Sequence, residues 1–366
     1  MKIIFRISQL GFGGAEQVFI SVARELKRRF NADITFVVDH MTGKNVVVAQ
    51  NMGFNVIPLN ASRTINSIIP LAKVITKERP DIVISAYTDT NAACLLSKVI
   101  ASYKVPVIVS EHASLTEHWQ SKSNVKKKVL NFYVSWVYKL ADKILCVSKG
   151  LEAQVNNRLK EPDKTLTIYN PVRFSGSIKK EVNNSNRLNL VAVGRVAPPK
   201  DYSTMIKAIA IIKKQRDVHL KIVGGTTNTK EFDKVKALVT EYQLEGNIEF
   251  VGYSDDVATY YQNADIFVLS SAWEGFGNVI VEAMAFGLPI IATNCNYGPS
   301  EILENGKYGR LANVGSSESI AQLVLEEANK PSVSTEVLVN RSKDFSEEII
   351  ADEYYALIKE VIKNEE

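Results

Sequence analysis

Two carboxylates in the segment SAWEGFGNVIVEAMAFGLPIIATN have the spacing of a ligand site. Glu274 and Glu282 stand eight positions apart, on either side of a Gly-rich turn and the expected start of a helix. Gly275 and Gly277 allow a ligand to approach the backbone closely, and a helix that begins near Asn278 directs backbone N–H groups and the positive end of its dipole at that ligand. The pattern favours an anion or a hydroxyl-rich group.

Each carboxylate has its own expected role. Glu282 falls one turn inside the helix, where it can accept two hydrogen bonds from a vicinal diol such as a ribose, and Glu274 precedes the helix, nearer to a sugar. The alternative is that Glu274 caps the helix and Glu282 is solvated. We disfavour it because Trp273, Phe276 and Ala283 surround the charges with apolar groups, where an unpaired carboxylate is costly.

Two cations follow an expected strand in VAVGRVAPPKDY, namely Arg195 and Lys200. A leaving nucleoside diphosphate gains negative charge in the transition state, and fixed cations in a dry cleft stabilise that charge. Such a site requires no metal ion. The alternatives are an ordinary surface ion pair for Arg195 and simple exposure to solvent for Lys200.

With these residues the sequence resembles glycosyltransferase family 4, the retaining enzymes of GT-B fold, over nearly the whole chain. The family's Glu-x7-Glu motif is EGFGNVIVE here. The resemblance implies that Glu274 contacts the transferred sugar and that Glu282 holds the donor ribose. It also implies that the backbone of the turn reaches the sugar hydroxyls and the diphosphate, through Phe276, Gly277, Asn278 and Val279.

Arg195 and Lys200 match the family's Gly-Arg and the Lys that follows it. The loop departs from the family at Asp201, where a small residue is more usual, and at Pro198-Pro199, which stiffens it. These departures bear on how the loop approaches a phosphate.

The first half carries a Gly-rich loop of its own, GFGGAE, between the first strand and the first helix. Gly13 and Gly14 resemble the family's loop, whose backbone meets the donor phosphates across the cleft. A dinucleotide fingerprint would require Gly at the position of Glu16, although Asp39 ends the second strand as a candidate ribose ligand. A nicotinamide-dependent enzyme therefore remains an alternative.

His112 ends a strand in VPVIVSEHAS, where side chains face a ligand cleft. The family often has a His near the sugar at this place, which implies a catalytic role for His112. A structural histidine is the alternative.

The segment GYSDDVATYYQNADIFVLSS resembles the part of the family that holds the nucleobase, and the expected base-binding turn consists of Gly252, Tyr253 and Ser254. Gly298 and Glu301, in NCNYGPSEIL, resemble variants of the family that use UDP-linked N-acetylhexosamine or hexose in polysaccharide and lipid-linked oligosaccharide assembly.

Alternating strand and helix patterns must position these residues, and this alternation is typical of βαβ units on a parallel sheet. The expected helices span 15–29, 65–78, 90–102, 149–159, 201–215, 230–243 and 278–286. We expect an α/β fold of two Rossmann-like domains whose parallel sheets face each other across a cleft, which is the GT-B architecture. The expected parts are an acceptor-binding domain over 1–174, a linker over 175–186, a nucleotide-sugar domain over 187–345, and a final segment, 346–366, whose helix crosses back.

The net charge of +4 conceals an asymmetry between the halves of the 366-residue chain. Residues 1–174 carry 24 basic and 13 acidic side chains, a balance of +11, and the remainder has a balance of −7. The basic half suits a negative partner such as nucleic acid, an anionic membrane or a phosphate-bearing acceptor, and unequal solvation charge is the alternative. In the segment 122–140 a stripe of apolar residues follows four lysines, which predicts a helix that docks on anionic lipid or packs on the sheet.

Three widely spaced cysteines, a short apolar N-terminus and the lack of a long apolar run predict a cytoplasmic protein, placed at the inner face of the membrane if the basic helix docks there. We expect transfer of a hexose or N-acetylhexosamine from a UDP-sugar to a glycan acceptor, for instance one linked to polyprenyl diphosphate, with no metal, no other cofactor and no nucleic acid. Retention is implied by the resemblance alone. A sugar-nucleotide epimerase and a non-catalytic nucleotide-sugar or carbohydrate-binding protein are the alternatives.

Overall fold

A computed structural model of the chain describes residues 1–11, 13–114, 133–173, 187–226 and 228–364. The chain divides into two compact units, Met1–Pro171 with Glu347–Glu366, and Val172–Ser346. Most of the predicted basic helix, 122–132, and the predicted linker, 175–186, lie outside the described residues.

The first unit is built on seven parallel strands in the order β3-β2-β1-β4-β5-β6-β7. Their bounds are β1 (Lys2–Arg6), β2 (Asp33–Val38), β3 (Asn55–Pro58), β4 (Ile82–Ala86), β5 (Val107–Glu111), β6 (Lys143–Cys146) and β7 (Thr165–Thr167). Strands β1, β4 and β5 are almost wholly buried, as expected when helices cover both faces of a parallel sheet.

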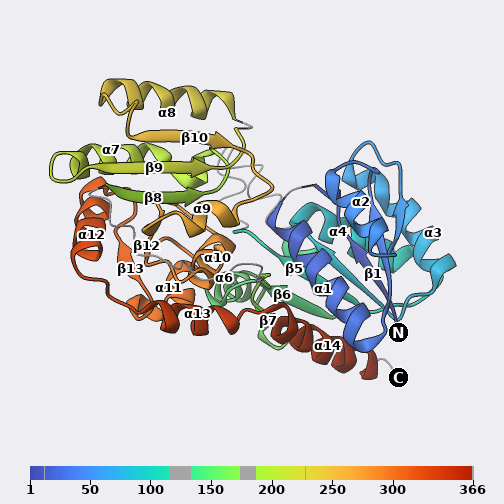
Figure 1. The fold of residues 1–366 in the computed structure, drawn as a ribbon. Helices are drawn as coiled ribbons and strands as arrows, with labels where there is room; N and C mark the ends of the chain where they lie inside the picture. The colour runs from blue at the N-terminus through green and yellow to red at the C-terminus, as the bar shows by residue number, and fades with distance from the viewer. Residues whose placement is uncertain (12, 115–132, 174–186, 227, 365–366) are drawn as a thin grey trace. The chain divides into compact units, whose positions relative to one another are not determined.

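Helices connect these strands, and one of them comes from the far end of the chain. They are α1 (Gly14–Phe30), α2 (Lys44–Asn51), η1 (Thr64–Ser67), α3 (Ile68–Glu78), α4 (Thr88–Ile100), η3 (Tyr138–Leu140), α6 (Lys149–Leu159), η4 (Pro162–Lys164) and α14 (Glu347–Lys363). Helix α14 runs alongside α1 (Figure 1), where the rings of Phe30 and Tyr355 stack at 3.8 Å and Arg29 pairs with Asp352 at 2.9 Å.

The second unit repeats the plan with six parallel strands in the order β10-β9-β8-β11-β12-β13. The strands are β8 (Leu188–Val193), β9 (Val218–Val223), β10 (Ile248–Gly252), β11 (Ile266–Leu269), β12 (Ile290–Thr293) and β13 (Arg310–Ala312). The helices are η5 (Pro198–Lys200), α7 (Tyr202–Lys213), α8 (Thr229–Glu241), α9 (Ala258–Gln262), α10 (Asn278–Ala285), α11 (Pro299–Ile302), η6 (Glu304–Gly306), α12 (Ser317–Asn329) and α13 (Thr335–Lys343).

Both sheets therefore have the doubly wound order of a Rossmann-like fold, in which the direction of winding reverses between two central strands. The reversal lies between β1 and β4 in the first unit and between β8 and β11 in the second. Ligands of such sheets bind beyond the carboxyl ends of the strands at this reversal. The loops that follow these four strands are therefore where functional side chains are expected.

Each sheet packs its own apolar core. In the first unit Phe5 of β1 contacts Phe19 of α1 edge-on at 4.9 Å and stacks on Phe36 of β2 at 5.5 Å. In the second unit the fully buried Ile209 of α7 and Val324 of α12 belong to the cluster that covers β8 and β9. These cores hold the strand ends in place.

Among the residues that the structure describes, no helix combines the length and the apolar character needed to span a membrane.

Candidate functional site

In the second unit, the loops after β8 and β11 meet at an ion pair. Lys200 Nζ lies 2.6 Å from Glu274 Oε1, and both side chains are largely shielded from solvent. Two further hydrogen bonds join the loops: Ser270 Oγ donates to the Lys200 carbonyl at 2.7 Å, and the Ala272 amide donates to the Pro199 carbonyl at 2.8 Å. The strand order thus brings together two of the residues that the sequence singled out.

The Glu274 carboxylate has a second partner on its own loop. Ser271 Oγ donates to Oε1 at 2.6 Å, and the Ser271 carbonyl in turn accepts a hydrogen bond from Thr293 Oγ1 at 2.6 Å. The Glu274 amide donates to the Asn296 carbonyl at 3.3 Å. Glu274 is thus fixed by an ion pair and a hydroxyl, and the alternative in which it caps the helix is wrong.

Glu282 lies on the second turn of α10, with a phenol as its partner. The OH of the buried Tyr261 donates to Glu282 Oε2 at 2.9 Å. Burial raises the pKa of the Glu282 carboxyl, against the opposing effects of the Tyr261 hydrogen bond and the Lys200 charge. Glu282 is therefore not a freely solvated helix residue, and its carboxylate has the capacity to accept hydrogen bonds from a diol.

The Gly-rich turn before α10 packs closely against a second turn, at Gly298. Gly298 has φ of 95°, and a Cβ atom there would lie 1.7 Å from the Phe276 carbonyl oxygen. Phe276 is buried, and its ring meets the Phe345 ring edge-on at 5.5 Å. The backbone at Gly277, Asn278 and Val279 is thereby fixed at the start of the helix, where the dipole favours an anion.

Arg195 follows β8 with an exposed side chain. In the described part of the chain it makes no hydrogen bond or ion pair, so the surface ion pair considered as an alternative is not found there. Its loop is anchored by the backbone, because the Val196 amide donates to the Gly225 carbonyl at 3.0 Å. A Cβ at Gly224 would lie 2.2 Å from the Gly194 carbonyl oxygen, so the ends of β8 and β9 touch through their backbones.

Gly224 was not among the predicted site residues, although the Gly pair after VHLKIV was a readable signal. Asp201, which departs from the family pattern, has a structural explanation. It is the N-cap of α7 and accepts hydrogen bonds from the Thr204 amide at 3.3 Å and from Thr204 Oγ1 at 2.6 Å. The Asp therefore stabilises the helix that begins directly after Lys200.

The expected base-binding turn lies at the end of β10. Tyr253 is half exposed, and its OH donates to Asp255 Oδ1 at 2.7 Å, which raises the pKa of the phenol. Ser254 Oγ accepts from the Asp256 amide at 3.1 Å. The turn that Gly252 begins is at the same edge of the sheet as the Lys200–Glu274 pair, and β9 lies between β10 and β8.

His112, in the first unit, follows β5. Its Nε2 atom is 3.0 Å from Ser110 Oγ, and the centroid of its ring lies 6.0 Å from that of Phe19 and 6.2 Å from that of Tyr87. Burial lowers the pKa of His112 to about 3, so the imidazole is neutral near pH 7. A neutral imidazole offers one N–H donor and one acceptor nitrogen.

Gly13, in the Gly-rich loop of the first unit, lies beside a carboxylate. Gly13 is the N-cap of α1 and Gly14 its first residue, and a Cβ at Gly13 would lie 2.2 Å from Glu16 Oε2. Tyr87, the residue after β4, donates its OH to the same Glu16 oxygen at 2.7 Å. Tyr87 was not among the predicted site residues, because no local pattern marks its unusual backbone.

Asp39, the candidate ribose ligand of a nicotinamide enzyme, has a different role. Its carboxylate forms a buried ion pair with Arg6, whose guanidinium also donates to Ser67 Oγ at 3.1 Å. An Asp engaged in this way is not available to a ribose. The structure therefore gives no support to the dinucleotide alternative.

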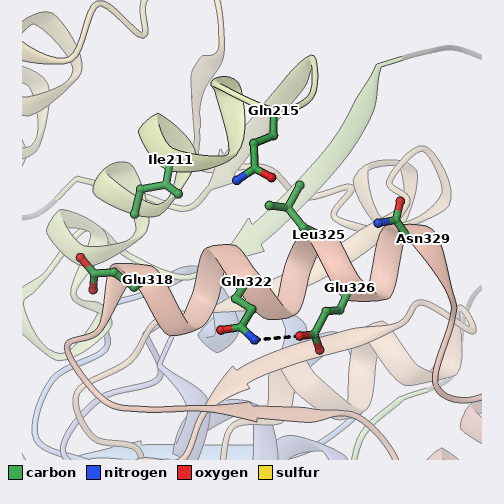
Figure 2. Close-up of a pocket in the computed structure, with 7 residues that line it drawn as sticks. All are labelled: Ile211, Gln215, Glu318, Gln322, Leu325, Glu326 and Asn329. Carbon is green, nitrogen blue, oxygen red and sulfur yellow. Dashed lines mark hydrogen bonds between the residues drawn. The ribbon is translucent and has the colours of Figure 1, made fainter.

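A groove in the second unit lies away from these residues. Figure 2 shows it between α7 and α12, with Gln322 Nε2 donating to Glu326 Oε1 at 2.9 Å. It is lined by Ile211, Gln215, Glu318, Gln322, Leu325, Glu326 and Asn329. None of them is a predicted site residue, and Ile211 is near the opposite end of α7 from Lys200.

Over the described ranges, no group of three or more His, Cys, Asp or Glu side chains could hold a metal ion. Independence from metal and from other cofactors stays a prediction.

Comparisons with known proteins agree with the fold. The family model "Glycosyl transferases group 1" matches residues 139–345, and the model "Glycosyltransferase Family 4" matches residues 12–175. A curated relative from Campylobacter jejuni, "GalNAc-alpha-(1->4)-GalNAc-alpha-(1->3)-diNAcBac-PP-undecaprenol alpha-1,4-N-acetyl-D-galactosaminyltransferase", is 25% identical, with 99% of each chain covered.

Two solved structures show the same fold over the full length. A glycosyltransferase from Rickettsia africae has a TM-score of 0.81 at 20% identity, with 99% of each chain covered. Anabaena Alr3699/HepE in complex with UDP-glucose has a TM-score of 0.83 at 19% identity, covering 98% of this chain and 100% of that one. The chain belongs to the group 1 and family 4 glycosyltransferases, and it is an enzyme of that class with the GT-B fold.

Proposed function

We propose that this glycosyltransferase moves a hexose or N-acetylhexosamine from a UDP-sugar to a hydroxyl of a lipid-linked glycan, with retention at the anomeric carbon and without a metal ion. The part of the proposal that concerns the donor is carried by one observation: Lys200, Glu274 and Glu282 lie at the winding reversal of the second sheet. The UDP-glucose bound to the Anabaena protein supports a UDP donor. The PP-undecaprenol acceptor in the name of the Campylobacter relative supports a lipid-linked acceptor.

The donor-binding residues have separate tasks in this proposal. Glu282 accepts hydrogen bonds from the ribose diol, and the backbone from Phe276 to Val279 meets the diphosphate and sugar hydroxyls. Lys200, which is largely shielded from solvent, and the exposed Arg195 stabilise the charge that grows on the departing diphosphate. Glu274, which is held in place by its ion pair with Lys200, contacts the transferred sugar.

The chemical step is a displacement on one face of the sugar. The bond from the anomeric carbon to the UDP oxygen breaks, and the bond to the acceptor oxygen forms on the same face. The acceptor proton passes to the departing phosphate oxygen, so no carboxylate is needed as a base. Positioning and electrostatic stabilisation supply the catalysis.

The first unit binds the acceptor in this proposal, and the lysine-containing segment 122–140 contacts the anionic inner face of the cell membrane. The described end of that segment exposes Trp136 by 58% and Tyr133 by 36%, as is typical of aromatic side chains at a lipid interface. The basic part of the segment, Lys122 to Lys128, lies outside the described residues.

The test begins with a thermal-shift screen of UDP-, GDP- and ADP-sugars, because a true donor stabilises the folded state by mass action. Transfer from the best donor to an undecaprenyl-diphosphate-linked glycan is then measured in excess EDTA, and NMR of the product gives the anomeric configuration. Activity lost in EDTA and restored by magnesium would refute metal independence, and an inverted product would refute retention. Conversion of the donor without acceptor would indicate an epimerase, and binding without any turnover a non-catalytic protein.

A further inference from the structure

Three elements of the first unit converge on one small cluster at the carboxyl edge of its sheet. Glu16 belongs to the first turn of α1, Tyr87 follows β4, and His112 follows β5. The Glu16 side chain is buried and accepts the Tyr87 hydroxyl at 2.7 Å, and the Tyr87 ring lies 6.2 Å from the His112 ring. The cluster thus connects the Gly-rich loop to His112 through one hydrogen bond and one ring contact.

Tyr87 holds an uncommon backbone conformation. Its φ of 73° and ψ of 134° lie outside the regions that a bulky residue ordinarily adopts. Strained conformations of this kind persist only where the surrounding structure holds them, and they are frequent at functional sites. The hydrogen bond to Glu16 holds the hydroxyl end of this side chain.

In the described part of the chain, only one of the two nitrogens of the His112 ring has a hydrogen-bond partner. Nε2 faces Ser110 Oγ at 3.0 Å, whereas the buried Nδ1 atom has no hydrogen-bond partner in the described part of the chain. A buried polar atom without a partner is costly and calls for a functional explanation. The rings of Phe19 and Tyr87 both pack against the His112 ring, with centroids 6.0 and 6.2 Å away.

We propose that Tyr87 and Glu16 are positioning residues, whose hydrogen bond holds the Tyr87 ring against His112 and keeps the imidazole in its reactive orientation. The consequence for activity rests on the proposed function and on the catalytic role near the sugar that the family resemblance implies for His112. The rival explanation is purely structural. Glu16 is the third residue of α1, where an acidic side chain commonly stabilises a helix start.

The kinetic test compares Y87F, H112A and the double variant Y87F/H112A in the full-length protein. Y87F removes one hydroxyl and should lower kcat about tenfold while the donor KM stays within about twofold of wild type. Because both residues act through the same imidazole, the double variant should be no slower than H112A alone. A kcat for Y87F within twofold of wild type, or losses that multiply in the double variant, would overturn the proposal.

Two further sets of variants separate positioning from stability. E16Q keeps an acceptor for the Tyr87 hydroxyl and should retain more activity than E16A, and this pair also replaces Y87F if that variant does not fold. A lower melting temperature of E16A with unchanged kcat would establish the structural explanation. The control is Y355F, which also removes a tyrosine hydroxyl, but from α14 and outside the cluster. Its kcat and melting temperature should match those of wild type.

A spectroscopic readout keeps the proposal testable without an activity assay. The ring proton resonances of His112 should shift in Y87F and remain in place in Y355F, because only the first change alters the contact to the imidazole. Unchanged resonances in Y87F would contradict the positioning role. If wild type and Y355F transfer no sugar from any UDP donor, the proposed function fails, and the resonances still decide whether Tyr87 orients His112.

Discussion

Lys200 Nζ lies 2.6 Å from Glu274 Oε1, and this contact ties the loop after β8 to the loop after β11 at the winding reversal of the second sheet. The two side chains are 20% and 12% exposed, so each would be left as a poorly solvated charge without the other. A bound diphosphate would add a third charge beside Lys200. The pair therefore fixes a cation for the donor and a carboxylate for the sugar with one interaction.

Replacing Lys200 by alanine removes the cation and leaves Glu274 without its ion pair. We expect kcat to fall by about 10²- to 10³-fold, the size of effect seen when one fixed electrostatic group is removed from a transition-state site. Steady-state kinetics with a UDP-sugar measures this. The matched control is K214A, at the opposite, exposed end of α7, which should leave kcat unchanged. A K200A enzyme within threefold of wild type would contradict the electrostatic role.

Variants of Glu282 and of its phenol partner, Tyr261, should weaken donor binding to different degrees. E282A should weaken UDP binding by about 1.5–3 kcal/mol, about 10- to 100-fold in Kd, because hydrogen bonds to a charged group are lost. Y261F removes only the 2.9 Å hydrogen bond that orients the carboxylate and should have a smaller effect, about fivefold. Calorimetric titration with UDP gives both values. Unchanged affinity in E282A would refute the ribose assignment.

Gly298 tests how tightly the Gly-rich turn is held. In G298A the new Cβ would lie 1.7 Å from the Phe276 carbonyl oxygen, so the turn before α10 must move and UDP affinity should fall. G306A is the matched control, since Gly306 also has a positive φ, 101°, but has open space around it. G306A should lose only about 1–2 kcal/mol of stability, which is the cost of the left-handed backbone conformation for a residue with a Cβ atom. Equal melting temperatures and UDP affinities for the two variants would contradict this account.

Two neighbouring residues of the first unit make opposite contributions to stability as pH changes. Burial raises the pKa of the Glu111 carboxyl from 4.5 to about 7, against the opposing hydrogen bonds from Tyr138, Asn91 and Thr88. Its contribution is therefore complete below about pH 4.5 and is lost as pH rises to about 7. Burial lowers the pKa of His112 from 6.5 to about 3, so its contribution is present above pH 6.5 and is lost as pH falls toward 3.

Between pH 4.5 and 6.5 the two effects oppose each other, and single variants should reveal them. In E111Q the slope of the free energy of unfolding against pH should be more positive than in wild type. In H112N the same slope should be more negative than in wild type. Each slope should change by up to about 1.4 kcal/mol per pH unit. Urea unfolding at several pH values across this window measures the slopes. Slopes equal to that of wild type in both variants would show that neither group is perturbed by burial.

Much of the secondary structure followed from local pattern. Helix α6 has the predicted bounds, Lys149–Leu159, because its apolar stripe follows Ser148, whose side chain accepts the Leu151 amide as an N-cap. Helix α2 was not predicted, since its KNVVVAQN contains a run of β-branched residues that is more typical of a strand. Burial of Val46 and Ala49 in the first unit's core decides for the helix.

The sequence alone determined that this protein has two parallel α/β sheets, that Arg195, Lys200, Glu274 and His112 follow strands, and that Glu282 lies inside a helix. Periodicity and motif spacing suffice for this because they are local properties of the chain. Only the tertiary structure decided the partners of these residues. Lys200 is 74 positions from Glu274, and Glu16 is 71 positions from Tyr87. Such pairs form only when the strand order brings particular loops together, and strand order depends on long-range packing that no local pattern contains.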